Sequence, residues 1–194
     1  MRVGGPHVST GALLRRLLTS GEESPLVLEA REILAGKFVS DEFANRLAQG
    51  AIAGLQSFVL DGYPRTVAQA QALDVFLATQ KKPLDAAILL EIGAEALATR
   101  LALRRICPLC SAAYHLDAFP PRCPNTCDVC RTVLVLRPED DQPEKVALRL
   151  ALYQEKTAPL ADYYAAQGKL HGVNAEPEAS TVFETICAVV KSLV

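Results

Sequence analysis

The chain has 194 residues, of which 50% are hydrophobic, and its formal net charge is -2 at pH 7. This length and composition exclude a disordered chain and favour one globular domain, or one domain with a small insert. The near-neutral charge offers no general field for wrapping DNA or RNA, so an anionic partner has to be a small ligand held by a local group of arginines.

Two further classes are excluded by the distribution of apolar residues and by the cysteines. Charged residues interrupt every apolar segment well short of the roughly 20 residues needed to cross a bilayer, and Met1 to Gly5 has no signal-peptide core. We therefore expect a cytoplasmic protein with no membrane and no nucleic-acid partner. In that compartment the six cysteines predict metal ligands or buried thiols in place of a disulfide framework.

The N-terminal part of the chain is predicted to be helical. The apolar periodicity predicts three helices in succession, Thr10 to Leu18, Ser24 to Ala35 and Ser40 to Ile52. Ser40, followed by the acidic residues Asp41 and Glu42, is expected to cap the third helix. Gly36 stands where the second helix would end in a left-handed residue.

Alternating strands and helices follow. The apolar runs Ser57 to Leu60 and Ala86 to Ile92 predict strands, and because polar residues do not alternate within them, both strands are expected to be buried on both faces. A helix is predicted between them, from Val67 to Gln80, and another after them, from Ala94 to Arg105. This βαβ order predicts an α/β fold with a parallel sheet flanked by helices.

An insert interrupts this pattern. Residues 107–136 are rich in Cys and Pro and hold little that could form a core unaided, so they are expected to form a separate lid, while residues 1–106 and 137–194 form the α/β core. After Pro143 one helix is predicted to run to about Gln167, followed by a strand near Lys169 to Asn174 and a last helix.

Four cysteines in the insert have the spacing of a zinc site. Cys107-x2-Cys110 and Cys127-x2-Cys130 are separated by sixteen residues, which is typical of a closed four-thiolate zinc site with a structural role. Cys123 lies four residues before Cys127 and could compete as a ligand, but we interpret it as a spare thiol.

Two other interpretations of the cysteines are less favoured. Two disulfides or free thiols would conflict with the cytoplasmic compartment and with the spacing. A zinc ribbon that binds nucleic acid would need more cations and aromatic rings than the insert contains, namely Arg122, Arg131, Arg137, Tyr114 and Phe119.

The block Asp61-Gly62-Tyr63-Pro64-Arg65-Thr66 follows the first predicted strand and indicates phosphoryl transfer. That chemistry needs the reactants held in line, with positive charge spread over the transferring oxygens, so several arginines are its expected signature. Asp61 at the end of a strand could hold a hydrated Mg²⁺. The arginines near element ends or beside the insert are Arg15, Arg65, Arg100, Arg104, Arg137 and Arg149. Taken singly, each could equally be a solvated residue on a helix surface.

The motifs taken together resemble a known family. They are His7-Val8-Ser9-Thr10-Gly11 leading to Arg15, Gly36 to Glu42, Asp61 to Thr66, Arg100-x3-Arg104-Arg105 before the first cysteine pair, and Thr157 to Leu160. In these blocks the chain, from Pro6 onward, resembles an adenylate kinase of the zinc-lid type. The resemblance implies a P-loop NTPase-like core and the conversion of ATP and AMP to two ADP, with Mg²⁺ accompanying ATP and structural zinc in the lid.

The resemblance also implies roles for individual residues. Residues 10–39 would form an AMP-binding helical region of the core. The AMP pocket would be formed by Thr10, Arg15, Lys37, Phe38, Val39, Gly62, Tyr63, Pro64, Arg65, Gln69, Arg137 and Arg149, with Gln69 contacting the adenine ring. ATP would contact Arg100, Arg104, Ala113, Tyr114 and, through main chain, Pro177. The catalytic residues would be Arg65, Arg104, Arg137, Arg149 and Asp61.

The sequence departs from the family in one respect. It contains no G-x-x-x-x-G-K-[ST] loop, and Met1-Arg2-Val3 leads directly into Gly4-Gly5-Pro6, where the family places a strand, the loop and a helix. We therefore expect impaired activity and a gap in the sheet. The family implies a monomer, but self-association would follow if that gap were exposed. Two alternatives remain: a non-catalytic AMP-binding protein of the same fold, and a zinc module that acts through partners.

Overall fold

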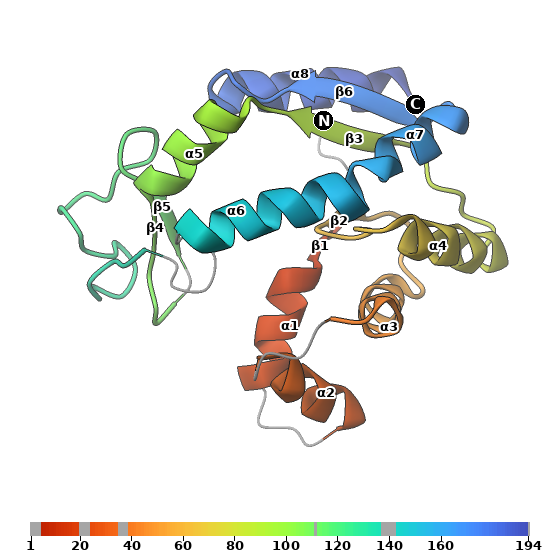
Figure 1. Cartoon of the computed structure of the whole chain (residues 1–194), viewed down its shortest axis with the longest axis horizontal. Coiled ribbons are helices and arrows are strands. Elements are labelled where there is room, and N and C mark those ends of the chain that lie inside the picture. Colours follow the sequence, from red (N-terminus) through yellow and green to blue (C-terminus); the bar gives the residue numbers. More distant parts are fainter. Residues whose placement is uncertain (1–4, 20–23, 35–38, 111, 137–142, 194) are drawn as a thin grey trace. The chain divides into compact units, whose positions relative to one another are not determined.

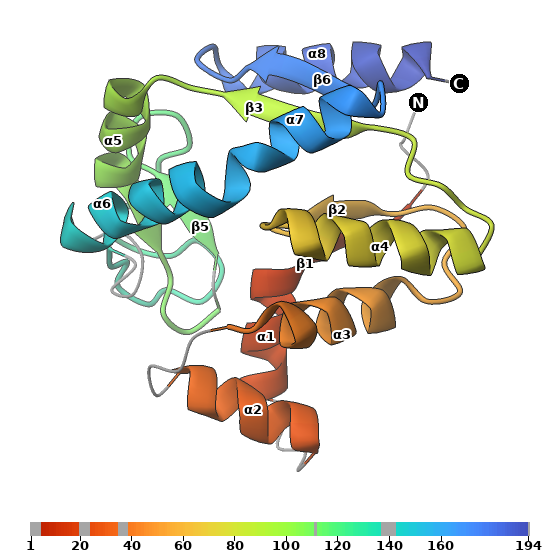
Figure 2. The ribbon, with the colours of Figure 1, turned by 45° about the vertical axis from the view of Figure 1, so that its right-hand side comes forward.

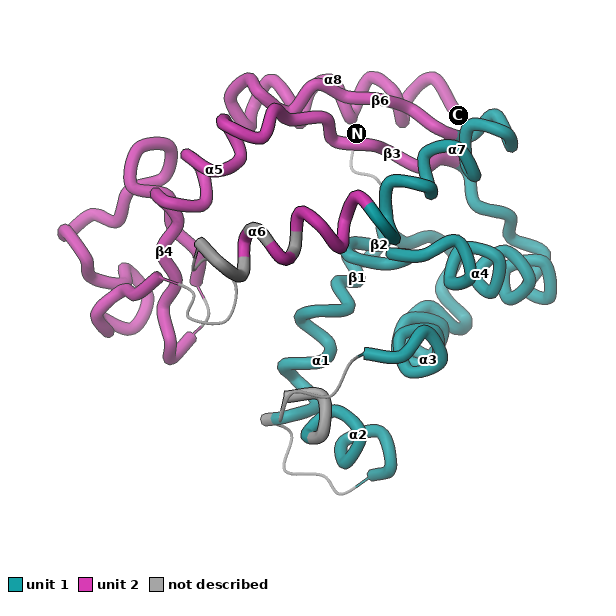
Figure 3. Tube along the Cα trace, viewed as in Figure 1, with its two compact units in different colours: residues 1–85, 155–169 teal, residues 86–154, 170–194 magenta. Residues whose placement is uncertain are grey.

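The computed structural model describes residues 5–19, 24–34, 39–110, 112–136 and 143–193. The chain divides into two compact units, which Figure 3 shows in different colours. Unit 1 comprises residues 1–85 and 155–169, and unit 2 comprises residues 86–154 and 170–194. Each unit is described by itself.

Unit 1 combines a small parallel sheet with helices (Figure 1). Its elements are β1 (His7–Ser9), α1 (Thr10–Thr19), α2 (Pro25–Leu34), α3 (Asp41–Ile52), β2 (Val59–Asp61), α4 (Val67–Thr79) and α7 (Pro159–Ala166). β1 and β2 pair in parallel, with Val8 opposite Leu60. The sequence did not predict β1, because three residues show no periodicity. A strand is present where Ser57 to Leu60 predicted one, but it begins two residues later, at Val59, and ends one residue later, at Asp61.

Gly5 allows the segment before β1 to lie against the segment before β2. A Cβ atom at Gly5 would stand 2.5 Å from the carbonyl carbon of Ser57, which no side chain could tolerate. The contact continues directly into the sheet, because the Val59 N–H donates to the Pro6 carbonyl at 3.0 Å. A residue with no side chain is therefore required at this approach.

Two groups of buried side chains hold unit 1 together. The larger packs β1, α3 and α4 around Val8, Ala48, Ile52, Tyr63, Leu73 and Leu77. The smaller joins α1, α2 and α3 around Ala30, Phe43 and Leu47. Helices α3 and α4 contact each other and lie side by side in Figure 2. Helix α3 contributes to both groups, so it links the two halves of the unit.

The N-terminal caps of α3 and α4 follow their sequences. The predicted cap of α3 is confirmed, because the Ser40 hydroxyl accepts a hydrogen bond from the Phe43 N–H at 3.1 Å. Thr66 caps α4 in the same way by accepting from the Gln69 N–H at 3.1 Å. Each cap satisfies one of the backbone donors that a helix leaves unpaired at its start.

Unit 2 contains the second parallel pair of strands. Its elements are β3 (Ala87–Glu91), α5 (Ala94–Leu103), β4 (Arg104–Ile106), β5 (Ala113–His115), α6 (Pro143–Leu152), β6 (Leu170–Asn174) and α8 (Ala179–Ser192). β3 and β6 pair in parallel over five residues, and α8 contacts β6. The parallel direction of these strands is as predicted, but the single parallel sheet is not observed: among the described residues, β2 pairs with β1 and β3 pairs with β6 in two separate sheets.

Two details of the strand and helix predictions are wrong. The strands are not buried on both faces, since Val59 is 42% exposed and Leu90 is 51% exposed. The reason is that, among the described residues, each parallel sheet has two strands, so neither strand has the interior position that continuous apolar runs usually occupy. The helix predicted to end at Arg105 ends at Leu103, because residues 104–106 pair with β5 as an antiparallel strand.

The helix predicted from Pro143 to Gln167 is divided. α6 passes into a π-helical turn, η1 (Tyr153–Thr157), and α7 begins afresh at Pro159. Proline has no N–H for a helical hydrogen bond, so it fits the first turn of a helix better than the interior. The predicted separation of a lid at 107–136 from the remaining core stays a prediction. Within the described part of the chain, every helix is too short or too polar to span a membrane.

Candidate functional site

The loop after β2 brings Thr10 and Arg65 to one carbonyl group. The Thr10 hydroxyl donates to the Gly62 oxygen at 3.1 Å, and Arg65 Nε donates to the same oxygen at 2.9 Å. Gly62 has a φ of +74°, and a Cβ there would lie 3.2 Å from an Arg65 guanidinium nitrogen. The left-handed backbone of Gly62 and its lack of a side chain therefore both serve this convergence.

Asp61 lies exposed at the end of β2, beside the neighbouring strand. Its Oδ2 is 3.2 Å from Nε2 of His7 on β1, and both side chains are more than 60% exposed. Asp61 is the last residue of β2, at the carboxyl edge where ligands commonly bind in parallel α/β folds, but its carboxylate contacts the first residue of β1. A pair so exposed contributes little to stability.

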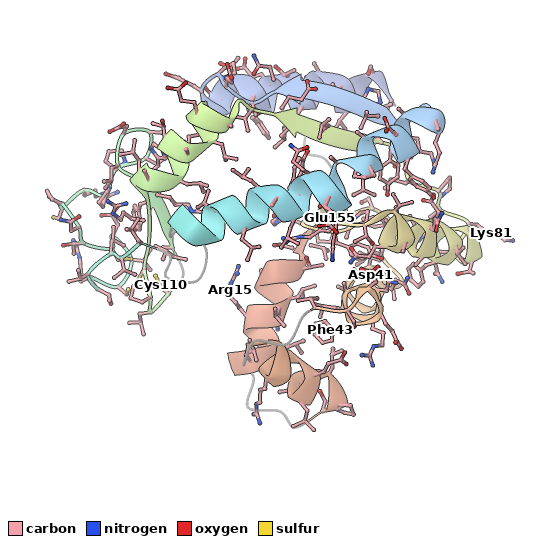
Figure 4. The ribbon with its side chains drawn as sticks, in the orientation of Figure 1. Arg15, Asp41, Phe43, Lys81, Cys110 and Glu155 are labelled. Carbon is pink, nitrogen blue, oxygen red and sulfur yellow. The ribbon has the colours of Figure 1, made fainter. Side chains whose placement is uncertain are left out.

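Arg15 is the second guanidinium of the expected AMP pocket in unit 1. It lies one turn along α1 from Gly11, and a Cβ on Gly11 would be 3.5 Å from an Arg15 guanidinium nitrogen. The side chain is exposed, and Figure 4 labels it on α1. Arg15 and Arg65 therefore give unit 1 two exposed guanidinium groups on or next to elements that meet at Gly62.

Tyr63 turns inward from the loop. Its ring is 4% exposed within the larger core group, and its hydroxyl donates to Oδ1 of Asn45 at 2.7 Å. Burial raises the pKa of Tyr63 to about 12. Any contribution of Tyr63 to a pocket would thus come from its main chain, while its side chain anchors the loop to α3. Pro64 follows it through a cis peptide bond.

Gln69 is buried among polar partners at the start of α4. Its Nε2 donates to Asp41 Oδ1 at 2.7 Å, and its Oε1 accepts from the Arg65 N–H at 2.7 Å. Thr66 donates to the other oxygen of Asp41 at 3.1 Å. The loop is held from a further side by Thr157, whose hydroxyl donates to the Arg65 carbonyl at 3.0 Å. The backbone at Arg65 is therefore fixed by hydrogen bonds from two directions.

Unit 1 holds most of the residues expected to bind AMP. The structure brings together Thr10, Gly62, Arg65 and Gln69 around the loop, while Val39 is 40% exposed just before α3. Lys37 and Phe38 lie outside the described residues, as does Gly36. The same is true of Arg137, and nothing is described for the side chain of Arg149 on α6.

Unit 2 brings two of the expected ATP contacts together. Arg100 on α5 donates to three consecutive carbonyl groups after β6: to Ala175 at 2.6 Å, to Glu176 at 2.8 Å and to Pro177 at 3.0 Å. The guanidinium group of Arg100 thereby holds the main chain of residues 175–177 in place. Arg100 therefore acts on the expected adenine-binding segment through its carbonyl groups.

The other expected ATP contacts belong to one hairpin. In the antiparallel pair of β4 and β5, Arg104 lies opposite His115 and Arg105 lies opposite Tyr114. Ala113 lies opposite Ile106, whose backbone also bridges to Val135. Arg104, Ala113 and Tyr114 are thus carried by a single small element of unit 2.

The four predicted cysteine ligands meet at one point. Their sulfur atoms all lie within 4.8 Å of one another, and Sγ of Cys107 is 3.3 Å from that of Cys130, while Sγ of Cys110 is 3.5 Å from that of Cys127. A tetrahedral Zn²⁺ with four thiolates would place the sulfurs about 3.8 Å apart, given a Zn–S bond of about 2.3 Å. The cluster therefore has the dimensions to hold a metal ion. Cys110 is labelled in Figure 4.

One hydroxyl group lies within hydrogen-bonding distance of each of two cluster sulfurs. The Tyr114 hydroxyl, 3.5 Å from Cys127, lowers the pKa of that thiol to about 6. The Thr132 hydroxyl, 3.3 Å from Cys130, likewise lowers the pKa of the Cys130 thiol. Both contacts favour the thiolate, which is the form that binds metal.

The cysteines also supply the core of the insert. Cys107 and Cys127 are fully buried and form a small cluster with Leu134. Cys123 is exposed and is not among the four cysteines of the cluster. Cys187 is half-buried on α8. A cluster this small agrees with an insert that depends on a metal ion for its stability.

Several residues of the site were not singled out from the sequence. Asn45 and Thr132 belong to no motif, and the motif blocks that contain His7 and Asp41 assign neither residue a role in the site. A signal existed only for Asp41, since an acidic residue in the first turn is favourable for the helix dipole. The partners of these residues lie on other elements, or beyond the cysteine pair in the case of Thr132, so no local pattern could identify them.

Comparison with known sequences gives a consistent result. The sequence model of one family, adenylate kinase, matches residues 2–169. The chain is 40% identical over 187 residues to an adenylate kinase of Nitrosococcus oceani. The matched region covers 94% of this chain and 85% of that protein. It is 43% identical over 175 residues to an adenylate kinase of Thermotoga maritima, covering 88% and 79%, and 37% identical over 185 residues to one of Clostridium novyi, covering 93% and 84%.

Proposed function

Because the chain belongs to the adenylate kinase family, we propose that its residues 5–85 form the AMP-binding half of a phosphotransferase that converts ATP and AMP to two ADP. The observation that carries this proposal is the convergence of Thr10 and Arg65 on the Gly62 carbonyl, with Arg15 on the adjoining helix. Guanidinium groups bind phosphate oxygens in a fixed fork geometry, which makes them suited to orienting a nucleoside monophosphate.

In this proposal different residues bind the phosphate, the nucleoside and the base of AMP. Arg15 and Arg65 hold the phosphate, and the family resemblance gives the same role to Arg137 and Arg149. The main chain of Gly62 to Pro64 and the segment Lys37 to Val39 line the nucleoside, and Gln69 contacts the base. Holding the acceptor phosphate in line with the donor supplies much of the catalysis in phosphoryl transfer, because little covalent chemistry is asked of the protein.

The donor nucleotide is assigned to unit 2. Arg104, Ala113 and Tyr114 on the β4–β5 hairpin and the main chain at Pro177 would contact ATP, and Arg100 would keep the Pro177 turn in place. Asp61 would hold a hydrated Mg²⁺ through the water ligands of the ion. The Mg²⁺ would supply the positive charge that accompanies ATP. Arg65 and Arg104 would then distribute positive charge around the transferring group.

We further propose that turnover by these 194 residues is impaired. Their sequence contains no G-x-x-x-x-G-K-[ST] loop, whose N–H groups and lysine would surround the β and γ phosphates. Loss of one preorganised donor can lower a rate by on the order of 10²-fold, so the loss of a whole loop should cost more. A non-catalytic AMP-binding protein of the same fold is the second candidate, and the same feature favours it.

The four-cysteine cluster is proposed to hold structural zinc. Four thiolates in a closed set leave no open coordination position, and buried Cys107 and Cys127 take the place of an apolar core. A cytoplasmic location and a monomeric state both stay predictions. Self-association is a further prediction, since within the part of the chain that the structure describes β2 and β3 each pair with one strand.

One pair of measurements tests these proposals. Titration calorimetry with AMP and with ATP separately should give binding of AMP, and Arg65→Ala should abolish it. A coupled assay with both nucleotides at high protein concentration should give little turnover. Robust turnover that disappears in Arg65→Ala would show that impairment is wrong, whereas absence of AMP binding would refute the AMP-binding half itself.

A further inference from the structure

We propose that Asp41 determines base specificity by holding the Gln69 amide in the one orientation that suits an adenine ring. The inference rests on the proposed function, in which Gln69 contacts the base of AMP. It assigns a role to a carboxylate that starts α3 and lies 28 residues from Gln69 in the sequence.

The two partners of the Gln69 amide demand the same orientation. Nε2 donates to Oδ1 of Asp41 at 2.7 Å, and Oε1 accepts from the Arg65 N–H at 2.7 Å. An ionised carboxylate only accepts hydrogen bonds, and a backbone N–H only donates them. Rotating the amide by half a turn would set its oxygen against the carboxylate and its NH₂ group against the N–H. Both contacts would become repulsive, so the orientation is fixed at both ends.

Asp41 is itself held in place. Its second oxygen, Oδ2, accepts from the Thr66 hydroxyl at 3.1 Å, and the preceding residue Ser40 caps the same helix. The start of a helix also favours a negative charge. Gln69 is 5% exposed, so little water is present to replace a lost partner. The Asp41 carboxylate therefore stays in position as a hydrogen-bond acceptor even if the Gln69 amide turns over.

The fixed amide leaves one donor and one acceptor for a ligand. Nε2 has a second hydrogen and Oε1 a second lone pair. Adenine presents an acceptor at N1 beside a donor at its 6-amino group, which matches this pattern. Hypoxanthine presents a donor at N1 beside an acceptor at O6, and would need the amide turned over. Asp41 thus favours adenosine monophosphate over inosine monophosphate.

The test compares the affinities of the full chain for these two nucleotides. Titration calorimetry should give tighter binding of adenosine monophosphate, and Asp41→Asn should lower the ratio of the two affinities by about 10-fold or more, because asparagine can present either an oxygen or an NH₂ group and no longer repels a turned amide. Asp85→Asn is the matched control. Asp85 is exposed in the same unit, and its substitution removes the same charge, so the ratio should be unchanged.

Each other outcome has a distinct meaning. If Asp41→Asn weakens both nucleotides equally, Asp41 only supports the structure and the inference is wrong. If the unaltered chain binds both nucleotides equally well, the inference is also wrong, although the proposed function stands. If the unaltered chain binds neither, the AMP-binding function is refuted, and the inference with it.

A second measurement needs neither ligand nor a variant of Asp41. The side-chain amide protons of Gln69, assigned by their loss in Gln69→Met, should exchange with solvent at least about 10-fold more slowly than those of the exposed Gln56, because one of them is bonded to a carboxylate in a buried position. Exchange as fast as that of Gln56 would show that the amide is free to turn, and would overturn the inference.

Discussion

The hydroxyl oxygen of Tyr114 lies 3.5 Å from the sulfur of Cys127, and it also accepts a hydrogen bond from the Asp128 N–H at 2.8 Å. The hydroxyl proton remains able to donate to the sulfur when Cys127 is a thiolate, which agrees with the lowered pKa of that thiol. A residue expected to contact ATP thus also supports the metal cluster.

Replacing Tyr114 by Phe should weaken metal binding. Removal of a hydrogen-bond partner of a ligand typically lowers metal affinity about 10- to 100-fold. Competition between the purified chain and a chromophoric chelator for Zn²⁺ measures the change. Tyr153→Phe is the control, since Tyr153 lies outside the cluster. Equal affinities in the two variants would mean that the Tyr114 hydroxyl has no influence on the metal.

The same contact affects the competition between protons and metal at Cys127. The Tyr114 hydroxyl lowers the pKa of the Cys127 thiol to about 6, so protons compete with metal at that thiol mainly below about pH 6. In Tyr114→Phe the pKa of the thiol rises, and competition should therefore begin at higher pH. Acid titration of the zinc-loaded chains, followed by released zinc, should show an upward shift of the midpoint in the variant. An unchanged midpoint would contradict this assignment.

Removal of the metal should unfold the insert and leave unit 1 folded. Cys107 and Cys127 form the centre of the small core around Leu134, and metal binding and folding are coupled in such clusters. Hydrogen exchange after chelation should show protection lost in residues 104–136 and retained in α3 and α4. Cys127→Ser should give the same pattern, whereas Cys123→Ser, at an exposed cysteine outside the cluster, should not.

Gly62→Ala should lower the affinity for AMP beyond what its small loss of unfolding free energy would explain. A Cβ at Gly62 would stand 3.2 Å from the Arg65 guanidinium and 3.3 Å from the Thr10 hydroxyl. Gly54→Ala is a matched control, because Gly54 has a similar φ of +76° but open space where the Cβ would go. Both variants should lose about 1 kcal/mol of unfolding free energy through backbone strain. Calorimetry should show lost AMP affinity in Gly62→Ala alone, and equal losses would exclude crowding as the cause.

Tyr63→Phe should destabilise unit 1 by about 1 to 2 kcal/mol, because it removes the donor to Asn45 in a buried position. Tyr163→Phe is an instructive comparison. Tyr163 donates to Asp74 at 2.7 Å, but Gln167 also donates to that carboxylate at 3.0 Å and remains in the variant. Urea unfolding should therefore give a larger loss for Tyr63→Phe. The opposite order would show that the bond to Asn45 contributes little.

Some of the site could be read from local patterns in the sequence. The cap at Ser40 and the convergence of the four cysteines depend on residues close together in the chain, and both are confirmed. The long helix after Pro143 was placed in the right region, although the break before Pro159 was missed. Short strands were the weakest predictions, because β1 and β4 each have three residues and exist only through their partners.

The sequence by itself determined the family, the parallel direction of the predicted strands and the cluster of cysteine ligands, because periodicity, turn residues and ligand spacing act over short distances along the chain. Only the tertiary structure decided that Asp41 meets Gln69, that Arg100 holds the carbonyl groups of residues 175–177, and that Tyr63 turns into the core. A hydrogen bond between residues 28 or 75 positions apart forms when packing brings the two groups together. No local pattern in the sequence records which partner a polar side chain will find there.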